Sequence, residues 1–425
     1  MVRVTPASTI ICVFVVAVAL FVTGRLPMGL VALSVPIALH LAGVIEAKEI
    51  FASVTSPSII LVLAMGVVGS ALFKTGMAAK LGKSLFRCCP GERSLVFAVV
   101  LLGGLLSGFV SNTGTVAVLM PIVMCAAAAK GLSASRLLVP LAYGATFGGN
   151  LSVIGSPGNL IAKDVIEKMS DGSMSVSFFE YAKAGLPLLL ALAVFLALFG
   201  GRLIPDRPSG SRGGPGDQTV AGSGKGALTV VVLMLSVVGM VASDSVRALP
   251  PMHVIACLGA MALVLFGVLT QKEAFASFDF QAVFLLAFMP PLGTALVKTG
   301  AAAAIADGVV RMTGGSGPYV LTGVLWIAVW VLTQLMSNTA TCALFCPIGW
   351  SVATSLGADP RAVVISVLIA SSVGVCTPLA IPANMLILEP GNLRFRDFFA
   401  GGLAVSAVAF VLSMLLLPRL YPFFP

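Results

Sequence analysis

Charged residues are scarce in this sequence. Asp, Glu, Lys and Arg make up only 10% of its 425 residues, whereas soluble domains carry about 25%. Hydrophobic residues account for 58% of the chain, and the mean hydropathy is +1.08. So few charges cannot keep a chain of this size in solution, which excludes a soluble globular protein and indicates an integral membrane protein.

The sequence also lacks the residues on which intramembrane enzymes depend. It has only two His, no HExxH motif and no acidic residue in the middle of an apolar run, so a metal-dependent or aspartyl mechanism would have neither ligands nor an acid. The eight Cys form no CxxC pattern and lie mostly inside apolar runs, which excludes a disulfide framework. We therefore expect that the protein is not an enzyme, and the same lack of central carboxylates argues against direct proton coupling.

Apolar runs long enough to cross a bilayer recur along the whole chain. They are continuous and rich in Gly, Ala, Leu and Val, which predicts transmembrane helices rather than the alternating strands of a barrel. Residues 204–226 are polar and Gly-rich, and they predict a flexible linker between the halves 1–203 and 227–425. Polar residues interrupt one apolar region in each half, 95–130 and 318–356.

Three pairs of short motifs indicate an internal duplication, because the two members of every pair are separated by nearly the same length of chain. The pairs are ALFKTG (71–76) with ALVKTG (295–300), SNTGTVAVLMPI (111–122) with SNTATCALFCPI (337–348), and IGSPGN (154–159) with LAIPAN (379–384). If 95–130 and 318–356 are re-entrant hairpins, each half has five full crossings. An odd number of crossings turns the second half over, so we expect an all-α polytopic protein of two inverted repeats, each with a hairpin and a broken helix.

Basic residues give the chain a net charge of +9, which in a soluble protein could indicate nucleic-acid binding. In a membrane protein, basic loops instead fix the topology and face anionic lipid, so we expect lipid and no nucleic acid as a partner. The concentration of Lys and Arg in 74–93 and around the linker predicts that the linker lies in the cytoplasm.

The two Ser-Asn-Thr triplets are polar groups inside apolar regions. Such a triplet can act as packing glue between helices, but two copies at one register favour a binding site. A broken hairpin exposes N–H groups that attract anions at a helix start. It also exposes carbonyl oxygens which, with hydroxyl and amide oxygens, suit a small cation such as Na⁺. Ser107 lies four residues before Ser111, and Thr333 four before Ser337, a spacing that predicts one shared helical face in each half.

The second interruption in each half combines a small residue, Pro and Asn. Pro breaks a helix and frees upstream carbonyl groups, and a simple kink is the alternative interpretation. Because Asn159 and Asn384 occupy the same register, we favour a functional break. No Lys or Arg lies in the middle of a span, so a bound anion would need neutral donors, helix dipoles and a compensating cation.

On these paired SNT motifs, Pro-broken helices and duplicated halves, the chain resembles the divalent anion–sodium symporter (DASS) family of the ion transporter superfamily, over nearly its whole length. The resemblance implies a homodimer in which a transport domain moves against a scaffold in an elevator fashion. We expect a multi-pass protein of a bacterial inner membrane that couples Na⁺ to the uptake of small anions, di- or tricarboxylates among them. The alternatives are an anion exchanger and an oxyanion exporter such as an arsenite carrier.

The resemblance also implies which residues bind. For the first Na⁺ site these are Ser107, Ser111, Asn112 and Gly155, and for the second Thr333, Asn338 and Ala380. For the substrate they are Asn112, Thr113, Ser156, Pro157, Asn338, Thr339, Ile381 and Pro382. The family commonly has Thr where this chain has Ile381, so one hydroxyl is missing. A monocarboxylate or another smaller anion is then an alternative to a symmetrically held dicarboxylate.

Overall fold

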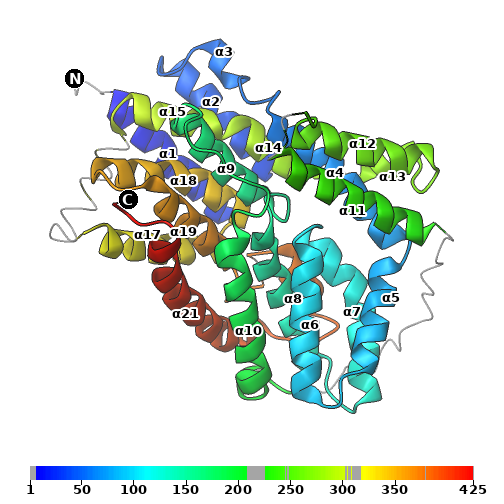
Figure 1. Cartoon of the computed structure of the whole chain (residues 1–425). Coiled ribbons are helices and arrows are strands. Elements are labelled where there is room, and N and C mark those ends of the chain that lie inside the picture. The colour runs from blue at the N-terminus through cyan, green and yellow to red at the C-terminus, as the bar shows by residue number, and fades with distance from the viewer. Residues whose placement is uncertain are drawn as a thin grey trace.

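The structure, a computed structural model, describes residues 6–207, 225–244, 248–301, 317–378 and 380–424, together with 246, 304 and 308. In that part of the chain every regular element is a helix (Figure 1). The first half contains α1 (Pro6–Thr23), α2 (Met28–Leu41), α3 (Ala47–Ile50), α4 (Pro57–Lys74), α5 (Met77–Arg87), α6 (Glu92–Ser107), α7 (Asn112–Ala129), α8 (Ser135–Gly148), the 3₁₀ turn η1 (Gly149–Leu151), α9 (Pro157–Met169) and α10 (Ala182–Leu203). The second half contains α11 (Gly226–Ser243), α12 (Met252–Leu265), α13 (Gln271–Ala276), α14 (Phe280–Phe288), α15 (Pro290–Lys298), α17 (Pro318–Thr333), α18 (Asn338–Ser355), α19 (Pro360–Ser372), α20 (Pro382–Leu386) and α21 (Phe395–Leu420).

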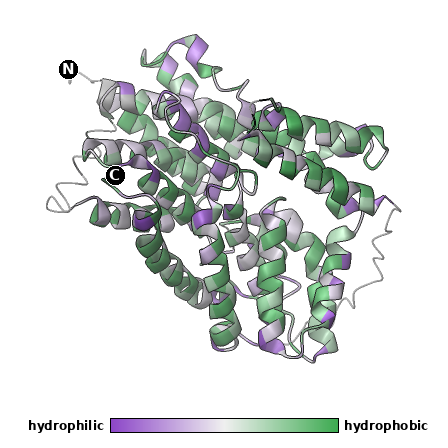
Figure 2. Ribbon diagram, in the orientation of Figure 1, coloured by the Kyte–Doolittle hydropathy of each residue, from purple (hydrophilic) through white to green (hydrophobic). Residues whose placement is uncertain are grey.

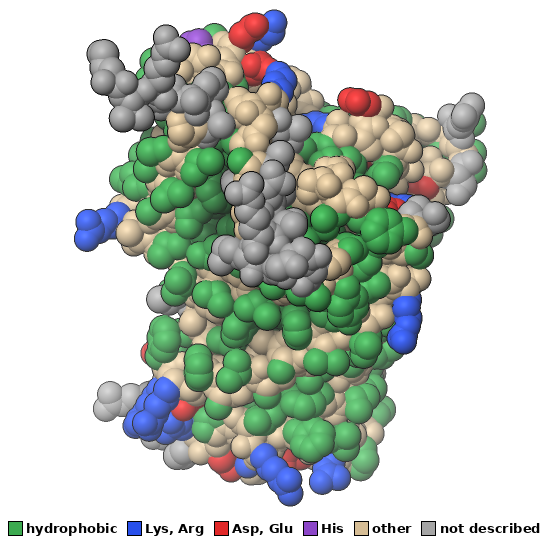
Figure 3. Space-filling model, turned by 90° about the vertical axis from the view of Figure 1, so that its left-hand side faces the viewer, with side chains coloured by type: hydrophobic (Ala, Val, Ile, Leu, Met, Phe, Trp, Pro, Cys, Tyr) green, Lys and Arg blue, Asp and Glu red, His purple; other side chains and the backbone are tan. Residues whose placement is uncertain are grey.

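The helices have the length and surface of membrane spans. Five of them, among the described residues, are long and apolar enough to cross a bilayer: α4, α7, α10, α11 and α21. Apolar residues dominate nearly every helix (Figure 2). On the face in Figure 3, a broad belt of hydrophobic side chains covers the middle, and most charged side chains lie toward the two ends. The all-α membrane fold expected from the sequence is confirmed. The predicted linker lies mostly outside the described residues, and its cytoplasmic location stays a prediction.

Short-range signals begin and end these helices. Ser56 caps α4 by accepting a hydrogen bond from the N–H of Ser58, and Pro57 takes the first helical position. The helix ends at Lys74, and Gly76 then turns the chain with a φ of 69°, a backbone conformation that favours Gly. The repeated KTG motif ends α15 in the same way, since Gly300 has a φ of 74°.

Two ion pairs join the halves reciprocally. Lys74 of the first half pairs with Glu273 of α13 at 2.7 Å, and Lys298 of the second half pairs with Glu49 of α3 at 2.5 Å. Both lysines belong to the KTG motifs, and the two glutamates are separated along the chain by the same interval as the two lysines. The duplication is therefore visible in tertiary contacts as well as in sequence.

The helices pack in two groups. In the first, α6 packs on α8 and α10, and α18 packs on α9 and α19; in the second, α4 packs on α12, α12 on α11, and α2 on α14. Figure 1 shows α4, α11 and α12 together at the upper right, above α6, α7 and α8. We name α6–α10 with α17–α21 the hairpin group, and α1–α4 with α11–α15 the frame group.

The helix pair α6–α7 begins and ends beside the C-terminal end of α10. Arg136, the second residue of α8, pairs with Glu92 at the start of α6 at 2.7 Å. The Ser135 hydroxyl donates to the carbonyl oxygen of Pro205, directly after α10, at 2.9 Å. The Arg207 guanidinium pairs with Asp397, at the start of α21, at 2.8 Å.

The helix pair α17–α18 has its open end at the opposite end of α10 and α21. The N–H of Asp359, between α18 and α19, donates to the carbonyl oxygen of Phe423 at 2.8 Å. The Tyr421 hydroxyl, at the end of α21, donates to Glu180, just before α10, at 2.7 Å. The two helix pairs therefore enter the hairpin group from opposite ends, so their tips can meet inside it.

One acidic side chain is buried at the boundary between the two groups. Asp164 lies in the C-terminal half of α9 and is only 8% exposed. The hydroxyls of Ser56 and Ser58 donate to its carboxylate at 3.2 and 2.5 Å, and Lys168 lies 3.6 Å away. The carboxylate is held because α4 brings the two serines to it across the boundary between the groups, a contact that hydropathy does not report.

Candidate transport site

Each SNT triplet lies at the start of a helix, after a break. Ser111 caps α7 by accepting from the N–H of Gly114 at 3.2 Å, and Ser337 caps α18 by accepting from Ala340 at 3.2 Å. Asn and Thr then occupy the first two helical positions. Because α6 has already ended at Ser107, the prediction that the hydroxyls of Ser107 and Ser111 share one helical face is wrong, as is its counterpart in the second half.

The break instead joins the last residue of one helix to the first residue of the next. The Ser107 hydroxyl donates to Oδ1 of Asn112 at 2.6 Å, and the Thr333 hydroxyl donates to Oδ1 of Asn338 at 2.9 Å. Ser107 and Thr333 are completely buried. Each half thus holds a hydroxyl oxygen and an amide oxygen side by side at a helix tip.

The second breaks lie beside these tips. In the first half, α8 ends at Gly148 and α9 starts at Pro157 with Ser156 as its cap, whose hydroxyl accepts from Gly158 at 3.3 Å. In the second half, α20 starts at Pro382 with Ile381 in the capping position and no side-chain cap. Ile381 is 6% exposed, so an apolar side chain replaces a hydroxyl at this point of the repeat.

Two glycines, Gly149 and Gly374, bring the breaks together. A Cβ added to Gly149 would lie 2.9 Å from Oδ1 of Asn112 and 3.5 Å from the carbonyl oxygen of Gly155. The structure therefore gathers Ser107, Asn112 and Gly155, three of the four predicted ligands of the first Na⁺ site. The fourth, Ser111, is exposed and uses its hydroxyl as a helix cap.

The second half repeats this arrangement around Gly374. A Cβ there would lie 2.8 Å from Oδ1 of Asn338, 2.9 Å from Cβ of Ala380 and 3.6 Å from the carbonyl oxygen of Thr333. All three residues predicted for the second site thus have an atom close to one glycine, and Asn338 approaches it with its predicted ligand atom. The sequence analysis missed both glycines, although Gly149 and Gly374 occupy equivalent positions in the two copies, just before the IGSPGN and LAIPAN motifs.

The predicted substrate residues lie at the helix starts. Thr113, Thr339 and Ser156 are partly exposed, and Pro157 and Pro382 occupy first helical positions. Among the described contacts, the hydroxyls of Thr113 and Thr339 have no hydrogen-bond partner.

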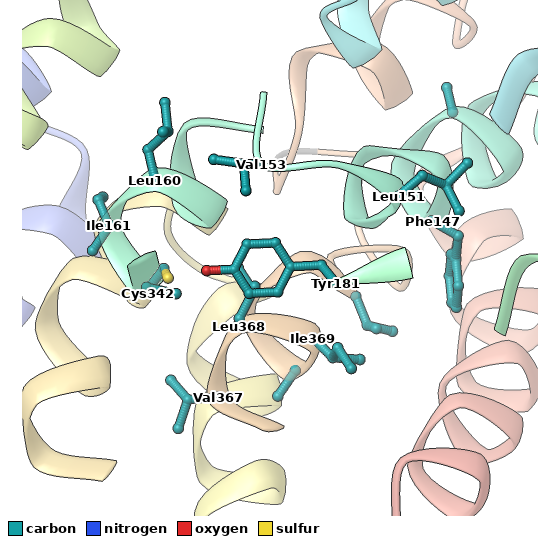
Figure 4. Packing of buried hydrophobic residues seen from close by; sticks show 14 of the residues in the cluster. Phe147, Leu151, Val153, Leu160, Ile161, Tyr181, Cys342, Val367, Leu368 and Ile369 are labelled. Carbon is teal, nitrogen blue, oxygen red and sulfur yellow. The ribbon is translucent and has the colours of Figure 1, made fainter. Parts of the chain in front are cut away.

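The two halves touch through Asn150, which the sequence analysis also missed. The Ser372 hydroxyl donates to Oδ1 of Asn150 at 3.1 Å, and the carbonyl oxygen of Ser372 accepts from Nδ2 of Asn338 at 3.3 Å. Val153 and Tyr181 belong to the buried apolar cluster that also contains Leu151 and Leu368 (Figure 4). The position equivalent to Asn150 in the second half holds Val375, so no repeat pattern marked the asparagine.

The chemistry of the site is neutral. Its polar atoms are hydroxyl, amide and backbone groups, and none of the ion pairs of the described residues includes a site residue. The described part of the chain contains no group of three His, Cys, Asp or Glu that could hold a metal ion. Neutral oxygen ligands suit hard cations rather than transition metals.

Comparison with known proteins places this fold among membrane transporters. A family model described as a citrate transporter, CitMHS, matches residues 18–250 and 245–423. The uncharacterized transporter YfbS of Escherichia coli K12 is 23% identical over 606 aligned residues, which cover 97% of this chain and 99% of that protein.

Two solved transporter structures share the fold. The YdaH transporter of Alcanivorax borkumensis has a TM-score of 0.61 at 16% identity, covering 91% of this chain and 90% of that one. MtrF of Neisseria gonorrhoeae, whose structure is described as illuminating a class of antimetabolite efflux pumps, has a TM-score of 0.62 at 16% identity, covering 99% and 97%. At such low identity these two structures bear on the fold alone.

Proposed function

This chain belongs to the citrate transporter family, CitMHS, of the ion transporter superfamily, and on that premise we propose that it takes up small di- or tricarboxylate anions in symport with Na⁺. We further propose that it does so by elevator-type alternating access, as a homodimer in a bacterial inner membrane. Membership of this superfamily was expected from the SNT motifs. The ion, the substrate and the movement are the proposal.

The observation that carries the proposal is the duplicated pair of oxygens. In each half, a buried hydroxyl donates to the Oδ1 of an asparagine at a helix start, Ser107 to Asn112 and Thr333 to Asn338. If the hydroxyl hydrogen turns away, both oxygens of a pair can face a small cation. In the first half, the carbonyl oxygen of Gly155 and Oδ1 of Asn112 both lie close to Gly149, so a third oxygen is near the pair. Uncharged oxygen ligands at a helix break are the arrangement that membrane transporters use for Na⁺.

The substrate would be held by helix starts. The helices α7, α9 and α18 each begin at the site, and the positive end of a helix dipole attracts a carboxylate. Thr113 and Thr339 add free hydroxyls. Because no Lys or Arg pairs with these groups in the described structure, the positive charge that balances a di- or tricarboxylate must come with it, and co-bound Na⁺ supplies that charge.

The two sides of the substrate site are unequal. Ser156 offers a hydroxyl on the first side, whereas Ile381 offers a buried apolar side chain on the second. Among di- and tricarboxylates, one whose carboxylates are unequally placed therefore fits better than a short symmetric dicarboxylate.

The division into two helix groups supports a movement of one against the other. All proposed ligands belong to the hairpin group, so the site can move as a unit. Contacts across the boundary include the close approach of Gly293 in α15 to Pro347 in α18 and the hydrogen bonds of Asp164 to the start of α4. The Asp164 hydrogen bonds join side chains, so they can break and be replaced by other partners when one group slides along the other.

The test is uptake of labelled citrate into proteoliposomes of the purified protein, with and without an inward Na⁺ gradient. Succinate, sulfate and a monocarboxylate serve as competitors. We expect Na⁺-dependent uptake and stronger competition from carboxylates than from sulfate. If the uptake of every tested anion is independent of Na⁺, the proposal is wrong. Stimulation of uptake by internal substrate in the absence of Na⁺ would identify an exchanger.

Two variants connect the activity to the site. Asn112→Ala and Asn338→Ala each remove an amide that hydrogen-bonds within the site, and each should lower Na⁺-dependent uptake about tenfold or more. Asn392→Gly is the matched control, because Asn392 is exposed before α21 and has a φ of 48° that Gly adopts without strain. Normal uptake by both site variants would show that the site is assigned to the wrong residues.

A further inference from the structure

A second asparagine in each half closes the break beside the proposed cation site. Asn159 is the third residue of α9 and is completely buried. Its Nδ2 donates to the carbonyl oxygens of Gly149 at 2.7 Å and Ser152 at 2.5 Å. One amide group thus ties both parts of the loop between α8 and α9 to the start of α9.

The second half contains the same closure. Asn384 is the third residue of α20 and is also completely buried. Its Nδ2 donates to the carbonyl oxygens of Gly374 and Thr377, both at 3.0 Å. Each acceptor occupies the position equivalent to its counterpart in the first half, so the arrangement is a property of the repeat and not of local packing on one side.

The orientation of both amides is fixed. An amide nitrogen carries two hydrogens, and both are used on carbonyl oxygens, so a flipped amide would turn its own oxygen toward two other oxygens. Oδ1 of Asn159 and Oδ1 of Asn384 then point away and have no hydrogen-bond partner among the described residues. Buried acceptors rarely go unpaired, because an unpaired one is destabilising. Both halves nevertheless leave this oxygen unpaired, which indicates that the two hydrogen bonds from Nδ2 are the interactions that matter at this position.

The carbonyl groups held by the asparagines belong to the wall of the site. Gly149 contacts Asn112, and the Ser152 hydroxyl donates to the carbonyl oxygen of Gly108, directly after Ser107. In the second half, Gly374 contacts Asn338, and the Thr377 hydroxyl donates at 2.8 Å to the carbonyl oxygen of Gln334, directly after Thr333. Each closing asparagine therefore positions the predicted cation ligands in two ways. It fixes the glycine beside the ligand asparagine, and it fixes the residue whose hydroxyl bonds the backbone next to Ser107 or Thr333.

The first closure also rests on a rigid base. The Tyr181 hydroxyl donates to the backbone carbonyl oxygen of Asn159 at 2.9 Å. Figure 4 shows the Tyr181 ring lying between α9 and α19, near Leu368 and with Cys342 on the side of its hydroxyl. Packed apolar neighbours of this kind leave the start of α9 little freedom to shift.

We infer that Asn159 and Asn384 are positioning residues, one for each cation site, which hold the breaks so that the oxygen ligands converge before an ion arrives. The inference rests on the proposed Na⁺ coupling. Loss of one asparagine should weaken cation binding in its own half and leave the substrate grip, which belongs to the helix starts, largely intact.

The first experiment needs no ion. Hydrogen–deuterium exchange of the full-length protein should show faster exchange of peptides that cover 149–156 in Asn159→Ala and of peptides that cover 374–381 in Asn384→Ala. Leu263→Ala is the control, because it removes a completely buried apolar side chain from α12, in the frame group, and contacts neither closure. If the two asparagine variants exchange no faster than Leu263→Ala in these segments, the closures do not hold the breaks and the inference is overturned.

The second experiment measures the Na⁺ concentration that half-maximally supports uptake, alongside the KM of the anion at saturating Na⁺. We expect each asparagine variant to raise the first value about tenfold and to change the second by much less. Asn159→Asp keeps the size of the side chain but directs a carboxylate at two carbonyl oxygens, so it should behave like Asn159→Ala.

The two possible failures are separate. A wild-type protein that ignores Na⁺ contradicts the proposed function, while the exchange experiment still decides whether the closures hold the breaks. A Na⁺-dependent wild type whose asparagine variants have an unchanged Na⁺ requirement, or a substrate KM that rises equally, overturns the positioning role.

Discussion

Adding one methyl group at Gly149 should weaken the first cation site without unfolding the protein. In Gly149→Ala, the new Cβ would lie 2.9 Å from Oδ1 of Asn112. An ordinary contact of a Cβ atom is 3.4 Å or longer, so the amide must retreat by about half an ångström. The backbone itself accepts Ala, because the φ of Gly149 is −53°.

The magnitude follows from the hydrogen bond that this shift stretches. The Ser107 hydroxyl now lies 2.6 Å from Oδ1 of Asn112, and a shift of about half an ångström lengthens that bond past its usual range. Loss of one such bond costs about 1 to 1.5 kcal/mol, which corresponds to about a five- to tenfold weaker site. Gly374→Ala should do the same in the second half, because its Cβ would lie 2.8 Å from Oδ1 of Asn338.

The assay is the Na⁺ dependence of labelled citrate uptake in proteoliposomes. Gly323→Ala is the matched control, because Gly323 lies in α17 and an added Cβ would meet only side-chain atoms, the nearest at 3.6 Å. We expect both site variants to need a higher Na⁺ concentration than the wild type, and the control to need the same concentration as the wild type. The free energy of unfolding of the control should rise by up to about 1 kcal/mol, because Ala is the better helix former. If Gly149→Ala and Gly323→Ala need the same Na⁺ concentration, Asn112 is not a cation ligand held against Gly149.

Three further outcomes follow from particular contacts. Gly148→Ala should lower the free energy of unfolding by about 3 kcal/mol or more, because its Cβ would overlap the carbonyl oxygen of Gly104, a backbone atom that cannot move aside as a side chain can. The measurement is Tm, which should fall strongly; a normal Tm would contradict this packing. The ion pair with Lys74 lowers the pKa of Glu273 to about 2, so its stabilising effect is present above the ordinary pKa near 4.5 and is lost only as the pH falls toward 2. The difference in Tm between wild type and Glu273→Gln should therefore stay constant from pH 7 to 5, and a difference that fades in that range would refute the pairing. Ile381→Thr restores a hydroxyl at the second break, so it should strengthen competition by succinate several-fold relative to monocarboxylates; unchanged competition would place Ile381 outside the substrate site.

The structure revises how the helix tips work. The sequence analysis treated Ser107 and Ser111 as neighbours on one helical face, because a spacing of four residues has that meaning only in an unbroken helix. The chain turns between them, and Ser111 caps the next helix instead. The hydroxyl of Ser107 meets Asn112, so the pair that carries the proposal consists of different atoms from those that the spacing suggested.

The sequence by itself determined the membrane class, the helix positions and the places where helices break. These depend on a residue and its neighbours within a few turns: the scarcity of charge, the continuous apolar runs, and the Ser-Pro or Ser-Asn starts. The repeated motifs also indicated that the chain is built twice. Together with the hydroxyl residue before each SNT triplet, they included the residues that pair at both tips, Ser107 with Asn112 and Thr333 with Asn338.

Only the tertiary structure decided which atoms converge. The close approach of Gly149 to Asn112, the hydrogen bond between Asn150 and Ser372, and the hydrogen bonds of Asp164 to Ser56 and Ser58 all join segments that are distant in sequence. Each depends on how whole helices pack, because a hydrogen bond needs its two atoms within about 3 Å and only the packing of both helices sets that distance.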